Sequence, residues 1–274
     1  MSNPTTLSDR MKDYEHRAQQ YLPRRSYTLI RVDGKAFHTY TRGLKKPFDE
    51  GLVDDMEATM IALCTGIQGA KLAYHQSDEI TVVVTDFDTH ETCMWFNGRT
   101  DKMCSVAASI ATAEFNSQRL VRAVGSGDID VLQLTGGQSI RLAQFDARVF
   151  TVPTRAETLN NLLWRQRDAI KNSISAAAQH HFSEKQLRGV NGNEKKRMLL
   201  AGGYDWNTLP IRLQRGSVCI KRSVFTSFTP TSVDLMPDGQ RSTAGIGTSR
   251  SKWMVEPAPD FAAMWDSSMI PERE

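Results

Sequence analysis

The sequence predicts an α/β fold, and three observations indicate it. Two runs rich in β-branched residues, 26–32 and 80–84, are typical of buried strands. Over 49–65 the apolar residues recur at helical spacing. The segment 154–181 is long enough for a major helix, and Thr154 with Glu157 three residues later has the pattern of an N-terminal capping box. Strands and helices therefore alternate along the chain.

The remaining segments complete this alternation. Further helices are expected over 9–20 and 102–116, and further strands from Gly69 toward Tyr74 and over 128–134, 145–152 and 218–221. The stretch 229–252 is rich in Ser, Thr, Gly and Pro, so we expect it to be extended or mobile. The predicted organisation is one domain over 1–228 with a helical insertion, followed by an extended C-terminal segment over 229–274.

Composition limits the classes of function. The 274 residues carry a net charge of +3, which permits a nucleic-acid partner at local basic patches but argues against a protein that coats nucleic acid. No apolar run reaches the roughly 20 residues of a membrane span, and Met1 to Arg10 lacks the apolar core of a signal peptide. We therefore expect a cytoplasmic protein without a membrane partner.

Cysteines and histidines form no metal-ligand pattern. Cys64 lies in an apolar helical stretch and is expected to fill the core. The pair His180-His181 is expected at an exposed helix end, because no acidic or thiol side chain stands one helical turn earlier. All four cysteines are expected to be reduced thiols, at Cys64, Cys93, Cys104 and Cys219.

Two acidic turns are the main candidates for chemistry. Asp33-Gly34 closes the first strand run, and Ser77-Asp78-Glu79 precedes the second. Taken singly, each is a common turn or cap. Together they place carboxylates beside neighbouring buried strands, where divalent metal is the obvious counter-charge. Two Mg²⁺ ions held about 3.5 to 4 Å apart by such oxygens would serve a phosphoryl transfer.

Four short motifs follow one another along the chain. They are Arg31-Val32-Asp33-Gly34-Lys35-Ala36-Phe37-His38, Lys46-Pro47, Gln76-Ser77-Asp78-Glu79 and Trp164-Arg165-Gln166. In this order they resemble the tRNA(His) guanylyltransferase family and its guanylyltransferase-like relatives. The resemblance implies a polymerase-like palm, with a mainly antiparallel sheet flanked by helices, that adds nucleotides to the 5′ end of tRNA in the 3′-to-5′ direction. It also implies ATP for activation of the 5′ end, GTP or another NTP as substrate, and a homotetramer.

The motifs carry the candidate site residues. Asp33 and Asp78 would ligate both metals with the Gly34 carbonyl, and Glu79, pointing to the opposite face, is a weaker catalytic candidate. By resemblance, the nucleotide-binding positions are Lys35, Ala36, Phe37, His38, Lys46, Ser77 and Asn172. Positions expected nearer the activated RNA 5′ end are Arg99, Lys102, Arg148 and Lys195. For any single Lys or Arg, ordinary solvation is the competing interpretation.

One segment departs from the family pattern. Eukaryotic members carry a His-Ile-Asn-Asn-Leu-Tyr-Asn run after the Trp-Arg-Gln motif, whereas this chain has Ile170-Lys171-Asn172-Ser173-Ile174-Ser175-Ala176. The family associates that run with recognition of histidine tRNA. We therefore expect template-dependent repair of truncated tRNA 5′ ends, with addition of an extra G to tRNA(His) as the alternative. A palm-type nucleotide cyclase and a catalytically idle RNA-binding module are the alternatives from other classes.

Overall fold

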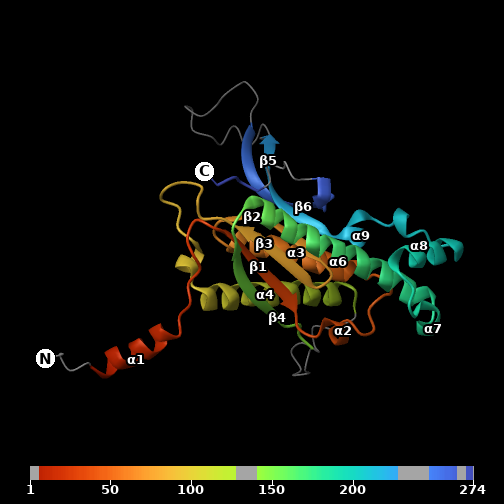
Figure 1. Cartoon of the computed structure of the whole chain (residues 1–274), viewed down its shortest axis with the longest axis horizontal. Coiled ribbons are helices and arrows are strands. Elements are labelled where there is room, and N and C mark those ends of the chain that lie inside the picture. Colours follow the sequence, from red (N-terminus) through yellow and green to blue (C-terminus); the bar gives the residue numbers. More distant parts are fainter. Residues whose placement is uncertain (1–5, 128–140, 228–246, 264–269, 274) are drawn as a thin grey trace.

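A six-stranded antiparallel sheet in the order β4-β1-β3-β2-β5-β6 organises the chain (Figure 1). The computed structural model describes residues 6–127, 141–227, 247–263 and 270–273. The strands are β1 (Tyr27–Gly34), β2 (Ala70–Gln76), β3 (Glu79–Val84), β4 (Phe145–Val152), β5 (Ser217–Ser227) and β6 (Gly247–Pro257). The mixed α/β class and the mainly antiparallel sheet are both confirmed.

Helices cover both faces of the sheet. The helices are α1 (Leu7–Arg17), α2 (Phe37–Tyr40), α3 (Glu50–Gly66), α4 (Thr100–Gly125), α6 (Arg155–His181), α7 (Glu184–Leu187), α8 (Gly192–Ala201) and α9 (Ile211–Arg215). Helices α3 and α4 pack on one face, and the N-terminal half of α6 packs on the other (Figure 1). The C-terminal half of α6 forms a separate small core with α7 and α8.

Strand β1 is buried on both faces, which explains its continuous apolar run. Ile30 and Val32 point into the core with α3 and α4, whereas Tyr27 and Leu29 point into the core with α6. β1 also pairs with β3 on one side and β4 on the other. A strand so enclosed holds its C-terminal residues in a rigid position, and Asp33 is one of them.

Most predicted elements are found near their expected bounds. The side chain of Thr154 caps α6 by accepting a hydrogen bond from the Glu157 N–H at 3.1 Å. Cys64 is buried, and His180 and His181 are exposed at the end of α6. The strand expected over 128–134 lies outside the described residues. Of the stretch 229–252, the described part, 247–252, is the beginning of β6.

Three expectations about element limits were wrong. The short strand expected over 218–221 is β5, which continues to Ser227 because it pairs with β6 along its whole length. Asp33 and Gly34 do not form a turn: they are the last residues of β1, because pairing with β4 continues through Gly34, and the reversal follows at Ala36, which has a φ of 53°. Helix α4 continues nine residues beyond the predicted end at Asn116, to Gly125. Arg119 and Arg122 in this extension are fixed by contacts with α3.

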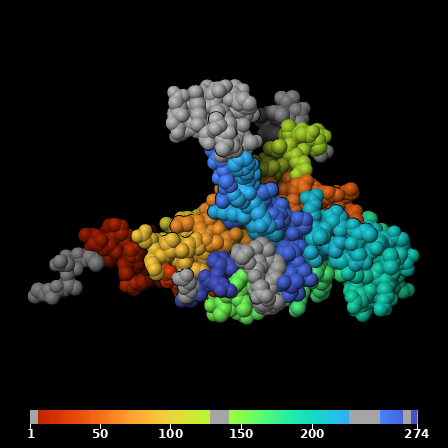
Figure 2. Space-filling view, turned by 90° about the horizontal axis from the view of Figure 1, so that it is seen from above, coloured from red at the N-terminus to blue at the C-terminus, as the bar shows by residue number. Residues whose placement is uncertain are grey.

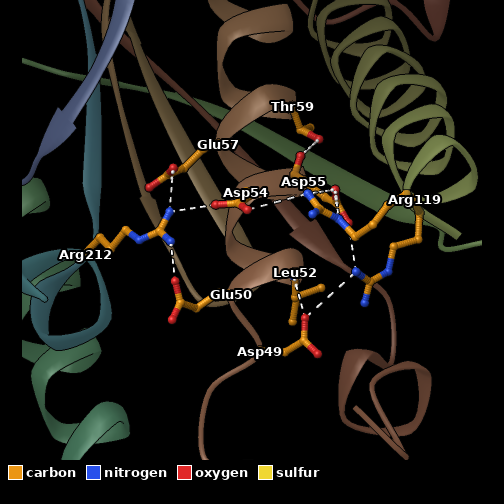
Figure 3. Close-up of polar contacts among 10 residues, drawn as sticks. Asp49, Glu50, Leu52, Asp54, Asp55, Glu57, Thr59, Arg119 and Arg212 are labelled. Atoms are coloured by element: carbon orange, nitrogen blue, oxygen red, sulfur yellow. Dashed lines mark hydrogen bonds and ion pairs between the residues drawn. The ribbon is translucent and has the colours of Figure 1, made fainter. Parts of the chain in front are cut away.

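Those contacts centre on a buried carboxylate. Asp55 of α3 is 1% exposed, and it accepts a hydrogen bond from Arg119 Nη1 at 2.8 Å (Figure 3). It accepts another from Arg122 Nη2 at 2.9 Å. The two cations lie more than 60 residues away in the sequence. The pair of interactions joins the two helices beneath the sheet.

We expect Asp55→Ala to lower the free energy of unfolding by about 2–3 kcal/mol, measured by urea denaturation. Loss of one partner of a fully buried ion pair costs about 3–5 kcal/mol, and here the arginines, whose side chains are 18% and 42% exposed, recover part of their hydration. The matched control is Asp54→Ala, whose carboxylate is 44% exposed and binds Arg212 and Arg122, with an expected cost below about 1 kcal/mol. Equal losses in the two variants would contradict this account of α3–α4 packing.

Candidate active site

The end of β1 meets the turn of the β2–β3 hairpin at one edge of the sheet. Ser77 and Asp78 form the two-residue turn, and Ser77 has a φ of 54°, in the left-handed region. The Gly34 N–H donates a hydrogen bond to the Asp78 carbonyl at 3.0 Å. This bond ties the turn to β1 and brings the carboxylates of Asp33 and Asp78 into one electrostatic environment, as their positions in the motifs predicted.

Negative charge accumulates at this edge. Burial, and then the charge of Asp33, raise the pKa of Asp78. Burial, and then Asp146, raise the pKa of Asp33, whereas Arg148, 4.0 Å away, lowers it. The Arg148 guanidinium also lies 3.3 Å from Asp146. Arg148 therefore faces both Asp33 and Asp146, and a site where burial and neighbouring acids raise carboxylate pKa values favours an added cation.

Gly34 is required by close packing at the turn out of β1. A Cβ at this position would lie 2.2 Å from the ring of Phe37, a buried residue three positions later in the same motif. The Phe37 ring in turn packs against Phe115 and Phe145 at centroid distances of 5.5 and 5.1 Å. Part of the first motif therefore serves to hold the chain reversal in place beside Asp33.

Glu79 occupies a different environment from the two aspartates. It is 6% exposed, and its carboxylate accepts two hydrogen bonds from Arg165 of α6, both at 2.7 Å. Arg31 lies 4.0 Å from it. Since its charge is already matched, the carboxylate is anchored to α6 rather than available as an open ligand.

The same anchoring explains Arg165 and Gln166, two residues of the fourth motif, on α6. Gln166 donates a hydrogen bond to the Pro259 carbonyl at 2.7 Å and accepts one from the Phe261 N–H at 3.0 Å. Trp164 is 55% exposed and stacks under the Arg165 guanidinium at 4.7 Å. Arg165 and Gln166 thus fasten α6 to the sheet and to the C-terminal segment, roles that the sequence pattern did not reveal.

A cavity of about 520 Å³ adjoins the acidic edge. Its wall is formed by the β2–β3 turn, the segment before α3, α6 and α9. Pockets of a few hundred to a thousand Å³ accommodate ligands of nucleotide size. The expected nucleotide-binding residues that line it are Ala36, Phe37, His38, Lys46, Ser77 and Asn172, and Gly34 and Asp78 line it too. Lys35 lies outside this wall, and its ammonium donates to Gln144 Oε1 at 3.1 Å.

The positions expected nearer the RNA 5′ end do not converge within the chain. Arg148 lies beside Asp33, and Lys195 on α8 donates to Ser175 Oγ at 3.2 Å. Arg99 and Lys102 lie at the N-terminal end of α4. The part of α4 nearest the acidic edge is at Thr112, whose hydroxyl accepts a hydrogen bond from the Phe145 N–H. At 1.5 Å per residue, Lys102 lies about 15 Å from Thr112 along the helix. Their role at the 5′ end stays a prediction.

Arg212 of α9 is a cavity residue that sequence reasoning missed. Its guanidinium lies 2.9 Å from Glu50, 2.7 Å from Asp54 and 3.3 Å from Glu57, all on α3 (Figure 3). These contacts fix one wall of the cavity to α3. The partners are separated by more than 150 residues, so no local pattern could have indicated them.

His75 is a second missed residue. It is 2% exposed, and burial lowers its pKa, so the ring is neutral. Its Nε2 lies 3.0 Å from the Ser77 carbonyl and, as the donor, supports the left-handed turn that carries Asp78. Its Nδ1 has no hydrogen-bond partner among the described residues. The His75 ring therefore helps to fix the conformation of the turn that carries Asp78.

Comparison with known proteins decides the family. The sequence profile of the family described as tRNAHis guanylyltransferase (Thg1) matches residues 8–153. The chain belongs to this family. It is therefore an enzyme, a 3′–5′ nucleotidyltransferase, and the resemblance indicated by the four motifs is confirmed.

Similar proteins span most of the chain. A bacterial tRNA(HIS) guanylyltransferase (Thg1)-like protein solved in complex with ATP is 34% identical, with 96% of this chain and 98% of that chain covered and a TM-score of 0.76. Its complex with GTP gives 33% identity, coverage of 97% and 98%, and a TM-score of 0.73. A probable tRNA(His) guanylyltransferase of Drosophila melanogaster is 27% identical over 72% of this chain and 68% of its own. The fold is thus the palm-type fold of Thg1-like proteins.

We expect Asp78→Asn to raise the melting temperature at pH 7 in EDTA, measured by thermal denaturation beside the wild type. Because the pKa of Asp78 is higher in the folded protein than in the unfolded chain, the folded protein binds the proton more tightly. The free energy of unfolding therefore falls as the pH rises through the folded pKa. The asparagine removes this loss. Added Mg²⁺ should stabilise the wild type more than the variant in thermal melts, and an equal Mg²⁺ effect on both would contradict a cation site here.

We expect His75→Ala to lower kcat about three- to ten-fold, since one hydrogen bond is worth about 0.5–1.5 kcal/mol. His75→Gln retains an N–H donor and should recover most of the loss. Steady-state kinetics measure the effect, and circular dichroism checks that both variants fold. If both variants lost the same activity, support of the Ser77 carbonyl would not be the function of this ring.

Proposed function

We propose that this enzyme repairs the 5′ end of tRNA by template-dependent addition of nucleotides in the 3′-to-5′ direction. The observation that carries the proposal is a cavity of nucleotide size whose wall includes Asp78 and Gly34, the residue next to Asp33. Lys46, Ser77 and Asn172 line that cavity and offer one cation and two polar side chains to a triphosphate.

Two Mg²⁺ ions are the metals that this donor set fits. The carboxylates of Asp33 and Asp78 and the carbonyl of Gly34 would hold them, and hard oxygen donors are what Mg²⁺ prefers. Burial raises the pKa of both aspartates, with a further contribution from Asp146 at Asp33 and from Asp33 at Asp78, so an added cation would stabilise their charged forms. Bound Mg²⁺ would offset the charge that develops on the reacting phosphate groups. Among the described residues no third His, Cys, Asp or Glu joins the pair.

ATP and GTP are the proposed nucleotides. The similar bacterial protein was solved with each of them, and the cavity here has a volume suited to one. We assign ATP to activation of a 5′-monophosphate end and GTP or another NTP to the addition. The residues around the cavity would orient the triphosphate, and the contacts of Arg212 with α3 hold one wall of the cavity in place.

The segment 170–176 supports repair over histidine-specific addition. Ser173 donates its hydroxyl to the Leu213 carbonyl at 2.6 Å and accepts from the Trp206 indole at 3.0 Å. Ser175 accepts from Lys195. These side chains are used inside the protein, and they leave Lys171 and Asn172 as the exposed residues of the segment. A site with so few contacts to offer would take its selectivity from base pairing across the acceptor stem.

A transfer assay with labelled NTPs tests the proposal. A tRNA lacking its first 5′ nucleotide should be extended by the nucleotide that pairs with the opposite strand, faster than full-length tRNA(His) is extended by G. A 5′-monophosphate should require ATP, and a 5′-triphosphate should not, because it already carries a leaving group. Efficient untemplated addition of G to tRNA(His) with poor repair would establish the alternative, histidine-specific activity.

Removal of either carboxylate should abolish that transfer. We expect Asp33→Asn and Asp78→Asn each to lower kcat by at least about a hundred-fold, the scale of loss when a group that stabilises transition-state charge is removed. Asp146→Asn is the matched control, because it removes the same charge from the neighbouring strand and should retain most of the activity. Near wild-type turnover of either test variant at saturating Mg²⁺ would contradict the assignment.

A further inference from the structure

Strands β5 and β6 continue beyond the sheet as a two-stranded ribbon. Residues 217–220 of β5 pair with β2. From Lys221 onward β5 pairs with β6 alone among the described residues. We call residues 221–225 and 248–253 the ribbon; at about 3.3 Å per residue, it projects about 16 Å past the last pair with β2. Figures 1 and 2 show it standing out from the body of the protein.

The ribbon carries cations and no acid. Lys221, Arg222, Arg250 and Lys252 lie in it, and neither 217–225 nor 248–255 contains Asp or Glu. Arg222 stands directly opposite Lys252. Like charges opposite one another destabilise a strand pair, so their retention here needs a reason other than the stability of the ribbon.

Three of these cations share one face. Arg222 and Lys252 are cross-strand partners, and Arg250 is the partner of Val224, two residues after Arg222. Cross-strand partners and residues two apart point to the same side of a strand pair. We call Arg222, Arg250 and Lys252 the basic face. All three are exposed.

The basic face is largely unneutralised, whereas the opposite face is occupied. Arg222 forms hydrogen bonds with Glu256 at 2.7 and 2.8 Å, but within the described part of the chain Arg250 and Lys252 have no ion pair. On the other face, Lys221 lies 4.9 Å from the Trp253 ring, and Trp253 packs against the core with α3 and α4. Arg250 and Lys252 are therefore available to an external anion, and Arg222 adds its charge beside them.

From these observations we infer that the basic face of the β5–β6 ribbon binds the phosphate backbone of the RNA substrate, away from the 5′ end. The inference rests on the proposed function, in which the substrate is tRNA. Gly216 lines the nucleotide cavity, so Arg222 and Arg250 lie about 20 and 26 Å along the strands from it. At that distance the contact is with the helical stem and is independent of sequence. Pairing with a second copy is disfavoured, because a two-fold interface would set this basic face against itself.

The test is the affinity for fluorescently labelled tRNA, followed by anisotropy from 50 to 200 mM KCl with no NTP present. The variants are Arg250→Gln, the triple Arg222→Gln/Arg250→Gln/Lys252→Gln, and Lys221→Gln as a matched control on the opposite face. The slope of log K against log salt is negative, and each lost phosphate contact should reduce its magnitude by about 1. We expect this magnitude to fall by about 1 for Arg250→Gln and by about 2–3 for the triple variant. The affinity of the triple variant should be about ten-fold lower. Lys221→Gln should bind like the wild type.

A short hairpin whose stem ends before the ribbon supplies the second readout. The triple variant should bind and extend this RNA like the wild type while its KM for full tRNA rises. An unchanged salt slope for tRNA in the triple variant would overturn the inference, as would equal losses in Lys221→Gln. A changed oligomer mass with unaltered tRNA affinity would assign the basic face to contact with another copy instead. Binding is measured separately from nucleotide transfer, so the two proposals can fail separately. If tRNA binding depended on the ribbon but no nucleotide were added to any 5′ end, the proposed reaction would be refuted and the ribbon contact would stand.

Discussion

The hydrogen bond from the Gly34 N–H to the Asp78 carbonyl is the interaction on which the site depends. It joins the last residue of a fully enclosed strand to a two-residue turn, so neither carboxylate can move away from the other without breaking sheet structure. Burial, together with the charge of Asp146 at Asp33 and of Asp33 at Asp78, raises the pKa of both aspartates, so keeping them charged costs free energy. The fold accepts this cost at the edge where a cation and phosphate groups would bind.

Other acidic residues of the same protein show how such a cost is normally avoided. Glu79, next in sequence to Asp78, is matched by two hydrogen bonds from Arg165. Asp55, more deeply buried, is matched by Arg119 and Arg122. The contrast separates these structural carboxylates from Asp33 and Asp78, whose pKa values are raised, since groups with perturbed pKa values beside a cavity are typical of functional sites.

The sequence predicted well what depends on local pattern. The run 26–32 predicted β1 because a strand buried on both faces is apolar throughout, and Thr154 predicted the start of α6 because a cap is a local interaction. Gly34 was misread as a turn residue, because the cause of the glycine is the Phe37 ring and not backbone conformation. Part of β6 was expected only as an extended or mobile stretch, since alternating Ser, Arg and Lys in an exposed ribbon resembles a loop in composition.

Contacts between distant segments could not be read in the same way. Arg212 meets α3 across more than 150 residues, and the motif gave no sign that Arg165 and Gln166 are anchors. The placement of Asp33 beside Asp78 was expected from the motifs, but its physical basis, a backbone hydrogen bond at the end of β1, needed the structure.

Anomalous diffraction from crystals grown with Mn²⁺ and a non-hydrolysable GTP analogue tests the central claim most directly. Manganese replaces magnesium at oxygen sites and gives a signal that identifies its position. The account predicts anomalous peaks between the carboxylates of Asp33 and Asp78, next to the triphosphate in the cavity lined by Lys46 and Ser77. Peaks elsewhere, or a triphosphate bound without metal contact to either aspartate, would contradict it.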